Sequence, residues 1–143
     1  MRPPRLCDSL PEHAPNSGGT SVEAWPTLLV IDDDPEMLRA LVCYFEKRGF
    51  HVAAGATIAD AKIFFHRRKS WTLVISDYHL RDGTGWELCC WLREQPGRPP
   101  PFLLMSGSIH GELLSEGLDF LAKPFAIAEL ENRVRLLLGR GIV

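Results

Sequence analysis

Short apolar runs alternate along most of this chain with segments whose apolar residues recur at helical spacing. The first run, residues 28–31, is continuous and partly β-branched, which predicts a buried strand. Asp34 and Pro35 then suit the N-cap and the first position of a helix that ends near Gly49. Its apolar positions are Met37, Leu38, Leu41, Val42 and Phe45.

The same alternation continues to the C-terminal end. We predict further strands at residues 51–54, 72–75, 102–105 and 118–121, and further helices beginning at Thr57 or Ala59, at the cap Thr84 and at Ile127. Residues 111–116 leave room for only a turn or two of helix, so the fourth helix is expected to be shortened. Five β-α units with helix-length crossovers predict an α/β fold, a doubly wound parallel sheet with helices on both faces.

Residues 1–26 lack such periodicity and are rich in proline, so we expect a disordered tail over 1–26 and a folded domain over 27–143. A hydrophobic fraction of 45% and a charged fraction of 24% are typical of a soluble protein. A net charge of -2 argues against nucleic-acid binding. With no membrane span and no signal-peptide core, we expect a cytoplasmic location. The four cysteines lack metal-site spacing, so we expect reduced thiols and no zinc.

Residues with reactive side chains follow four of the predicted strands. Asp32 and Asp33 follow the first, Asp77 the third, Ser106 the fourth and Lys123 the fifth. The carboxyl ends of parallel strands meet at one edge of a sheet, where ligands bind in open α/β folds. Clustered carboxylates repel one another unless a proton or a cation offsets them, and Mg²⁺ prefers oxygen ligands. These residues therefore predict a site for a phosphoryl group and a divalent cation.

Asp77 is the candidate nucleophile of that site, because a carboxylate can accept a phosphoryl group as an acyl phosphate. Lys123, the hydroxyl of Ser106 and the backbone N–H of Gly107 can neutralise the phosphoryl oxygens. Each signal has a plainer explanation when taken alone: the aspartate run can cap a helix, and a lysine is most often a surface residue. The sequence does not decide whether the Lys123–Pro124 peptide bond is cis.

In this order and spacing, the chain resembles a response-regulator receiver (CheY-like) domain of two-component signalling, over about residues 28–139. The resemblance implies a flavodoxin-like sheet of strand order 2-1-3-4-5. It implies a phosphoacceptor regulator rather than an enzyme, with phosphotransfer to Asp77 from a histidine kinase or a histidine phosphotransfer protein. The downstream protein target is unknown, and a homodimer is one assembly that such domains form.

The resemblance also implies roles for individual residues. Mg²⁺, or Mn²⁺ in its place, is held by Asp33, Asp77 and the main-chain carbonyl of His79, with Asp32 acting through water. On phosphorylation Ser106 shifts toward the phosphoryl oxygens, and the aromatic side chain of Phe120 turns inward with it. Protein contacts on the fourth helix, fifth strand and fifth helix then switch.

The chain departs from the receiver pattern in two places. Only residues 107–122 separate Ser106 from Lys123, which shortens the fourth helix and leaves the usual dimerisation and output surface open. Arg81 stands where many receivers have proline, and His79 places an imidazole beside the site. That imidazole either points to solvent or positions water for dephosphorylation.

Two other functions share features with this sequence. A haloacid-dehalogenase-like phosphohydrolase needs a threonine where this chain has Glu36, and it needs a later carboxylate pair that is absent. A receiver-shaped interaction module that works without phosphorylation remains an alternative. After Gly139 only four residues follow, so we expect no DNA-binding output domain. The chain is then either a single-domain regulator or the receiver module of a hybrid kinase, with Trp86 and Trp91 as candidate contact residues.

Overall fold

The fold is built around a five-stranded parallel sheet of order β2-β1-β3-β6-β7. The computed structural model describes residues 25–108 and 116–139. The strands are β1 (Thr27–Ile31), β2 (His51–Gly55), β3 (Leu73–Asp77), β6 (Phe102–Ser106) and β7 (Asp119–Ala122). Counting these five alone, the order is 2-1-3-4-5, so the predicted doubly wound α/β fold is confirmed.

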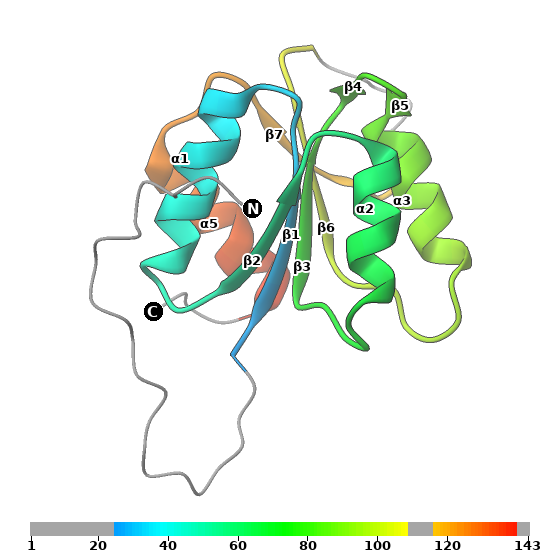
Figure 1. Ribbon diagram of the computed structural model, residues 1–143. Helices are drawn as coiled ribbons and strands as arrows, with labels where there is room; N and C mark the ends of the chain where they lie inside the picture. The colour runs from blue at the N-terminus through cyan, green and yellow to red at the C-terminus, as the bar shows by residue number, and fades with distance from the viewer. Residues whose placement is uncertain (1–24, 109–115, 140–143) are drawn as a thin grey trace, which may run out of the picture.

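Helices cover both faces of the sheet (Figure 1). They are α1 (Pro35–Glu46), α2 (Ile58–His66), α3 (Gly85–Glu94) and α5 (Ile127–Leu138). Helices α1 and α5 lie on one face, and α2 and α3 lie on the other. Alternate residues of each strand therefore enter different cores: Leu28 and Val30 pack on the α1–α5 side, while Leu29 and Ile31 pack on the α2–α3 side. Because both faces are buried, the strands read as continuous apolar runs.

The helix starts follow the local capping chemistry that the sequence predicts. The Asp34 carboxylate accepts a hydrogen bond from the Glu36 N–H, and Pro35 opens α1. Thr84 and Glu87 form a capping box at the start of α3, in which each side chain accepts from the other residue's backbone N–H. The sequence predicts that the second helix begins at Thr57 or Ala59. Thr57 is the N-cap of α2, and its side chain accepts from the Asp60 N–H.

A small hairpin is the part of the fold that the sequence did not reveal. Strands β4 (His79–Leu80) and β5 (Gly83–Thr84) pair in antiparallel fashion directly after β3. The sequence does not predict this hairpin, since two-residue strands are too short to show an alternating pattern. The hairpin brings the chain from the carboxyl end of β3 straight into α3.

Other expectations differ from the structure or lie outside the described residues. Cys43 is disulfide-bonded, whereas Cys89 and Cys90 are free. The expectation of reduced thiols throughout is thus wrong for Cys43; spacing along a chain does not tell which distant cysteines meet. Nearly all of the tail and most of the shortened fourth helix fall outside the residues that the structure describes. Across the described ranges, no helix is long and apolar enough to cross a bilayer.

Candidate functional site

The carboxyl ends of β1, β3, β6 and β7 meet at one edge of the sheet, at the top in Figure 1. Asp32 directly follows β1, and Asp77 is the last residue of β3. Ser106 ends β6 opposite Ala122 of β7, so Lys123 is the next residue on the neighbouring strand. The parallel register thereby gathers at one edge the side chains that the sequence places at four strand ends.

Three carboxylates cluster at this edge. One oxygen from each of Asp32, Asp33 and Asp77 lies within 4.8 Å of the others. The side chain of Asp32 is fully buried, and that of Asp77 is 13% exposed. Lys123 Nζ lies 3.1 Å from Asp32 Oδ2 and 3.1 Å from Asp77 Oδ1. One ammonium group thus bridges the two buried carboxylates.

Burial and neighbouring charges have opposite effects on the pKa values of Asp32 and Lys123. Burial raises the pKa of Asp32, although hydrogen bonds from the Asp34 N–H and from Lys123 oppose that effect. Burial also disfavours the charged form of Lys123, but the hydrogen bonds and charges of Asp32 and Asp77 outweigh it and raise the pKa of the ammonium group. Three carboxylates against one ammonium group leave an excess of negative charge, which a divalent cation would neutralise.

The three carboxylates differ in how many of their oxygen atoms already accept hydrogen bonds. Both oxygens of Asp32 already accept, Oδ1 from the Asp34 N–H at 2.9 Å and Oδ2 from Lys123. Asp77 gives only Oδ1 to Lys123, and in the described part of the chain Asp33 has no side-chain hydrogen bond. Asp33 and Asp77 therefore fit direct metal ligation, and Asp32 fits a contact through water. All three belong to the predicted site and are brought together.

Ser106 and Lys123 are held beside the carboxylates by the pairing of their strands. The Lys123 N–H donates to the Ser106 carbonyl at 2.8 Å, and Ser106 is 1% exposed. The Ser106 hydroxyl oxygen accepts from the Ser108 N–H at 3.1 Å, which fixes the turn that carries the exposed Gly107. The Lys123–Pro124 peptide bond is cis.

Phe120, the predicted switch aromatic, lies on β7 opposite Leu104 of β6. Its ring is half-buried and packs against the core on the α2–α3 side of the sheet. The predicted ligand residue His79 lies in the hairpin after Asp77 with an exposed side chain.

Sequence reasoning missed two residues that fix the loop after Asp77. A Cβ on Gly85 would lie 2.5 Å from the Asp77 carbonyl oxygen and 2.7 Å from Leu104 Cδ1, so only glycine fits at the start of α3. The Asp82 carboxylate accepts from the Ile58 N–H at 2.8 Å and from the Ala59 N–H at 3.0 Å. Asp82 therefore ties the hairpin to the N-terminus of α2. A glycine directly after the predicted cap Thr84 was the sequence signal for the close contact at Gly85. The Asp82 contact gave no such signal, because it joins segments far apart in sequence.

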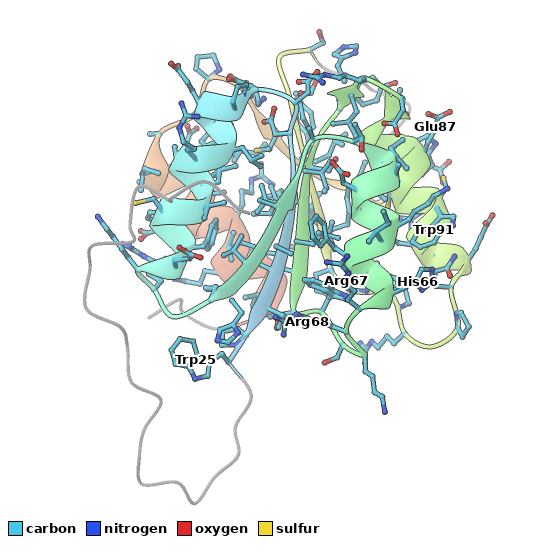
Figure 2. All side chains as sticks on the ribbon, viewed as in Figure 1. Trp25, His66, Arg67, Arg68, Glu87 and Trp91 are labelled. Carbon is cyan, nitrogen blue, oxygen red and sulfur yellow. The ribbon has the colours of Figure 1, made fainter. Side chains whose placement is uncertain are left out.

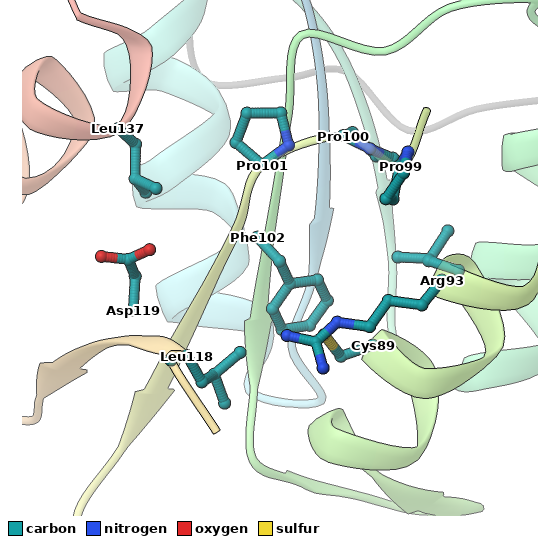
Figure 3. A pocket seen from close by; sticks show the side chains of 11 residues that line it. Cys89, Arg93, Pro99, Pro100, Pro101, Phe102, Leu118, Asp119 and Leu137 are labelled. Carbon is teal, nitrogen blue, oxygen red and sulfur yellow. The ribbon is translucent and has the colours of Figure 1, made fainter. Parts of the chain in front are cut away.

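A hollow lies at the end of the sheet opposite the carboxylate cluster, where β6 and β7 begin (Figure 3). Its volume is about 210 Å³, and its wall includes Arg93, Phe102, Leu118 and Asp119. Ligand pockets usually measure about 300–1,000 Å³, so this hollow is small for a ligand site. It contains none of the predicted site residues.

Comparisons with known proteins agree with this geometry. A family model described as "Response regulator receiver domain" matches residues 28–135. A curated relative, the transcriptional regulatory protein GltR of Pseudomonas aeruginosa, is 32% identical over 121 residues, which are 80% of this chain and 50% of the relative. The photosynthetic apparatus regulatory protein RegA of Rhodovulum sulfidophilum is 33% identical, over 81% of this chain and 63% of the relative. The chain thus spans about half to two thirds of the length of these relatives.

Solved structures show the same fold. A response regulator receiver protein from Pseudomonas putida superposes with a TM-score of 0.72 at 27% identity, over 80% of this chain and 99% of that one. The response regulator TrrA of Thermotoga maritima, solved in complex with Mg(2+)-BeF, superposes with a TM-score of 0.69 at 23% identity, over 79% and 99% of the two chains.

Proposed function

This chain belongs to the response-regulator receiver family of two-component signalling, a family of phosphoacceptor regulators rather than enzymes, and on that premise we propose that it accepts a phosphoryl group on Asp77. The observation that carries the proposal is the lysine-bridged carboxylate cluster. Lys123 contacts both Asp32 and Asp77 at 3.1 Å, with Asp33 beside them. A structural ion pair needs one carboxylate, whereas three around one ammonium group suit the binding of a cation and a phosphoryl group.

The proposed transfer forms one bond and breaks one. A carboxylate oxygen of Asp77 attacks the phosphorus of a phosphohistidine, the P–N bond breaks, and the imidazole nitrogen leaves with the bonding electron pair. Lys123 donates to the phosphoryl oxygens, as do the Ser106 hydroxyl and the Gly107 N–H. Asp77 is nearly buried at a strand end, which limits the orientations of its carboxylate and favours in-line attack.

Asp33, Asp77 and the main-chain carbonyl of His79 are the proposed ligands of Mg²⁺, with Asp32 acting through water. Hard oxygen donors suit Mg²⁺, and Mn²⁺ accepts the same set. The ion supplies positive charge that offsets the negative charge of the phosphoryl oxygens. The acid cluster supports this assignment, because its charge is only partly balanced by Lys123.

Membership of the family implies a histidine kinase partner in general terms. We propose that this kinase, or a histidine phosphotransfer protein, donates the phosphoryl group in the cytoplasm. We further propose that phosphorylation moves Ser106 and Phe120 and so switches contacts with a protein target or a second copy of the chain. The chain covers only 50% and 63% of the two curated relatives. The output of the whole protein is therefore part of this proposal.

Intact-mass spectrometry after incubation with phosphoramidate and Mg²⁺ tests the proposal. We expect the mass of one added phosphoryl group on the parent protein and none on Asp77→Asn. Asp34→Asn is the matched control, since this exposed aspartate caps α1 and is expected to leave phosphorylation unchanged. Small phosphodonors do not serve every receiver, so a phosphorylated histidine phosphotransfer protein is the second donor. A folded protein that takes a phosphoryl group from neither donor would favour the phosphorylation-independent interaction module.

A further inference from the structure

The hairpin of β4 and β5 carries His79 and joins the phosphoacceptor strand β3 to α3. Figure 1 shows it at the end of the molecule where both α2 and α3 begin. Figure 2 shows Glu87, from the first turn of α3, at this same end, whereas Arg67 and Arg68 lie at the opposite end of α2. The hairpin is therefore placed to contact the starts of both helices.

The base of the hairpin is fixed to the sheet by backbone hydrogen bonds. The Tyr78 N–H donates to the Met105 carbonyl on β6 at 2.8 Å, and the Gly85 N–H donates to the Tyr78 carbonyl at 2.7 Å. Antiparallel pairs alternate between hydrogen-bonded and non-hydrogen-bonded, so the next pair, His79 with Thr84, is a non-hydrogen-bonded one. The register thus turns the His79 carbonyl away from the opposite strand, as its proposed role as a ligand requires.

The tip of the hairpin is held to α2 by the side chain of Asp82. Its Oδ1 accepts from the Ile58 N–H at 2.8 Å, and its Oδ2 accepts from the Ala59 N–H at 3.0 Å. These are the first two N–H groups of α2, which have no carbonyl partner within the helix. The third, that of Asp60, donates to the Thr57 hydroxyl instead. Asp82 thus binds α2 with both oxygens of its carboxylate.

Close packing supports this polar contact. Leu80 of the hairpin and Ile58 of α2 are both buried in the core on the α2–α3 side of the sheet. A Cβ on Gly83 would lie 2.7 Å from Ile58 Cδ1 and would overlap Glu87 Oε1 of α3. The hairpin is therefore packed against the first turns of both helices, and its position depends on theirs.

We propose that Asp82 is a positioning residue for the Mg²⁺ site: by tying the hairpin to α2, it holds the main-chain carbonyl of His79 where the ion binds. This inference rests on the proposed function, in which that carbonyl is a ligand together with Asp33 and Asp77. Mg²⁺ demands near-ideal octahedral geometry, so a ligand on a displaced backbone binds it less well. Replacing residues that orient metal ligands commonly lowers the affinity by about tenfold or more.

The coupling between the ion and the Asp82 contact acts in both directions. If the closed contact favours the ion, the ion favours the closed contact by the same factor. Mg²⁺ should therefore slow hydrogen exchange at the Ile58 and Ala59 amides, which donate to Asp82. The Asp60 amide, which donates to Thr57 in the same turn, should be slowed less. This measurement needs only the parent protein.

Electron paramagnetic resonance of free Mn²⁺, with Mg²⁺ as the competitor, measures the affinity of the full chain and its variants. Asp82→Ala should weaken binding by about fivefold or more. Asp82→Asn loses the same charge but keeps an acceptor oxygen, so it should bind more tightly than Asp82→Ala. Thr57→Ala is the matched control, because it removes a cap from the same turn through a hydrogen bond internal to α2. It should change the affinity by less than about twofold.

An Asp82→Ala variant that binds the ion as tightly as the parent would overturn the positioning role and leave the metal site itself standing. Equal losses in Asp82→Ala and Asp82→Asn would also overturn it, because the charge of Asp82 rather than its hydrogen bonds would explain the effect. Equal losses in Asp82→Ala and Thr57→Ala would reduce the effect to the stability of α2. Failure of the metal site is distinguishable: the parent and Asp33→Asn would then bind the ion equally or not at all.

Discussion

Single residues decide how close the helices come to the reactive edge, and Gly85 is the clearest case. Helix α3 begins against the carbonyl of Asp77 because Gly85 has no side chain there. The Gly85 N–H also donates to the Tyr78 carbonyl at 2.7 Å, which closes the hairpin onto the helix. Any larger residue would push the start of α3 away from β3 and would shift the backbone that carries the candidate nucleophile.

Replacing Gly85 by alanine should therefore destabilise the protein by about 1–3 kcal/mol, since the new methyl group meets the backbone carbonyl oxygen of Asp77 and the buried side chain of Leu104. Urea unfolding measures the loss. Gly107→Ala is the control, because a Cβ at Gly107 meets nothing within 4 Å. If Gly85→Ala were as stable as the parent, the close approach of α3 to β3 would not hold in solution.

At the scale of elements, the sequence predicted every strand of the parallel sheet, four helices and the caps of two of them, because these depend on local periodicity and capping chemistry. Asp34 and Thr84 cap as expected, and Thr57 is the cap of α2, for which the sequence left Thr57 and Ala59 open as the start. The strand-end site was predictable for the same reason, since parallel strands bring their carboxyl ends together. The hairpin after β3 was not predictable, because its two-residue strands are too short to show an alternating pattern. The contact of Asp82 with α2 was not predictable either, because it joins residues 23 and 24 positions apart in sequence.

Asp82 links the hairpin to the N-terminus of α2, so replacing it should lower the stability of the protein. Asp82→Ala leaves the Ile58 and Ala59 N–H groups without their acceptor and should cost about 1 kcal/mol, the usual size of a lost N-cap. The hydrogen bond from the Ile58 backbone lowers the pKa of Asp82 in the folded protein. The stabilising contact is therefore fully present above the unfolded pKa and is lost as the pH falls through the lower, folded value.

Urea unfolding of the parent and of Asp82→Ala across acid pH checks this prediction. The stability difference should be constant near neutral pH and should shrink in acid, while Asp60→Asn, which retains an acceptor for the Ala56 N–H, serves as a comparison. A difference that grows as the pH falls would contradict the assigned role of Asp82.

For the whole molecule, the sheet separates two cores and leaves the reactive groups at one edge. The acid cluster there brings like charges together in the folded state, and Lys123 only partly offsets them. A ligand that binds the folded state alone raises its stability in proportion to the logarithm of ligand concentration. The family's metal site should thus be measurable as a change in the stability of the entire fold.

Mg²⁺ at one hundred times its dissociation constant should stabilise the parent by about 2.7 kcal/mol, and excess EDTA should remove the effect. Thermal melts with and without the ion measure it. Asp33→Asn should lose most of this response, because it replaces a carboxylate that is proposed to bind the ion directly. The same substitution at Asp34, which lies outside the cluster, should keep it. An equal Mg²⁺ response in Asp33→Asn and the parent would place the ion elsewhere.

The carboxylate edge and the basic turn after α2 lie at opposite ends of the molecule and carry opposite charges. The carboxylates lie at the carboxyl ends of the strands, and Arg67, Arg68 and Lys69 directly follow the last residue of α2. A charged partner that approaches is then rotated by the field before contact, so that more of the random encounters lead to productive ones. Phosphorylation would add negative charge at the end that is already negative and so increase this charge asymmetry. A partner drawn to the positive end would thus meet a molecule that orients more strongly once its far end has been phosphorylated.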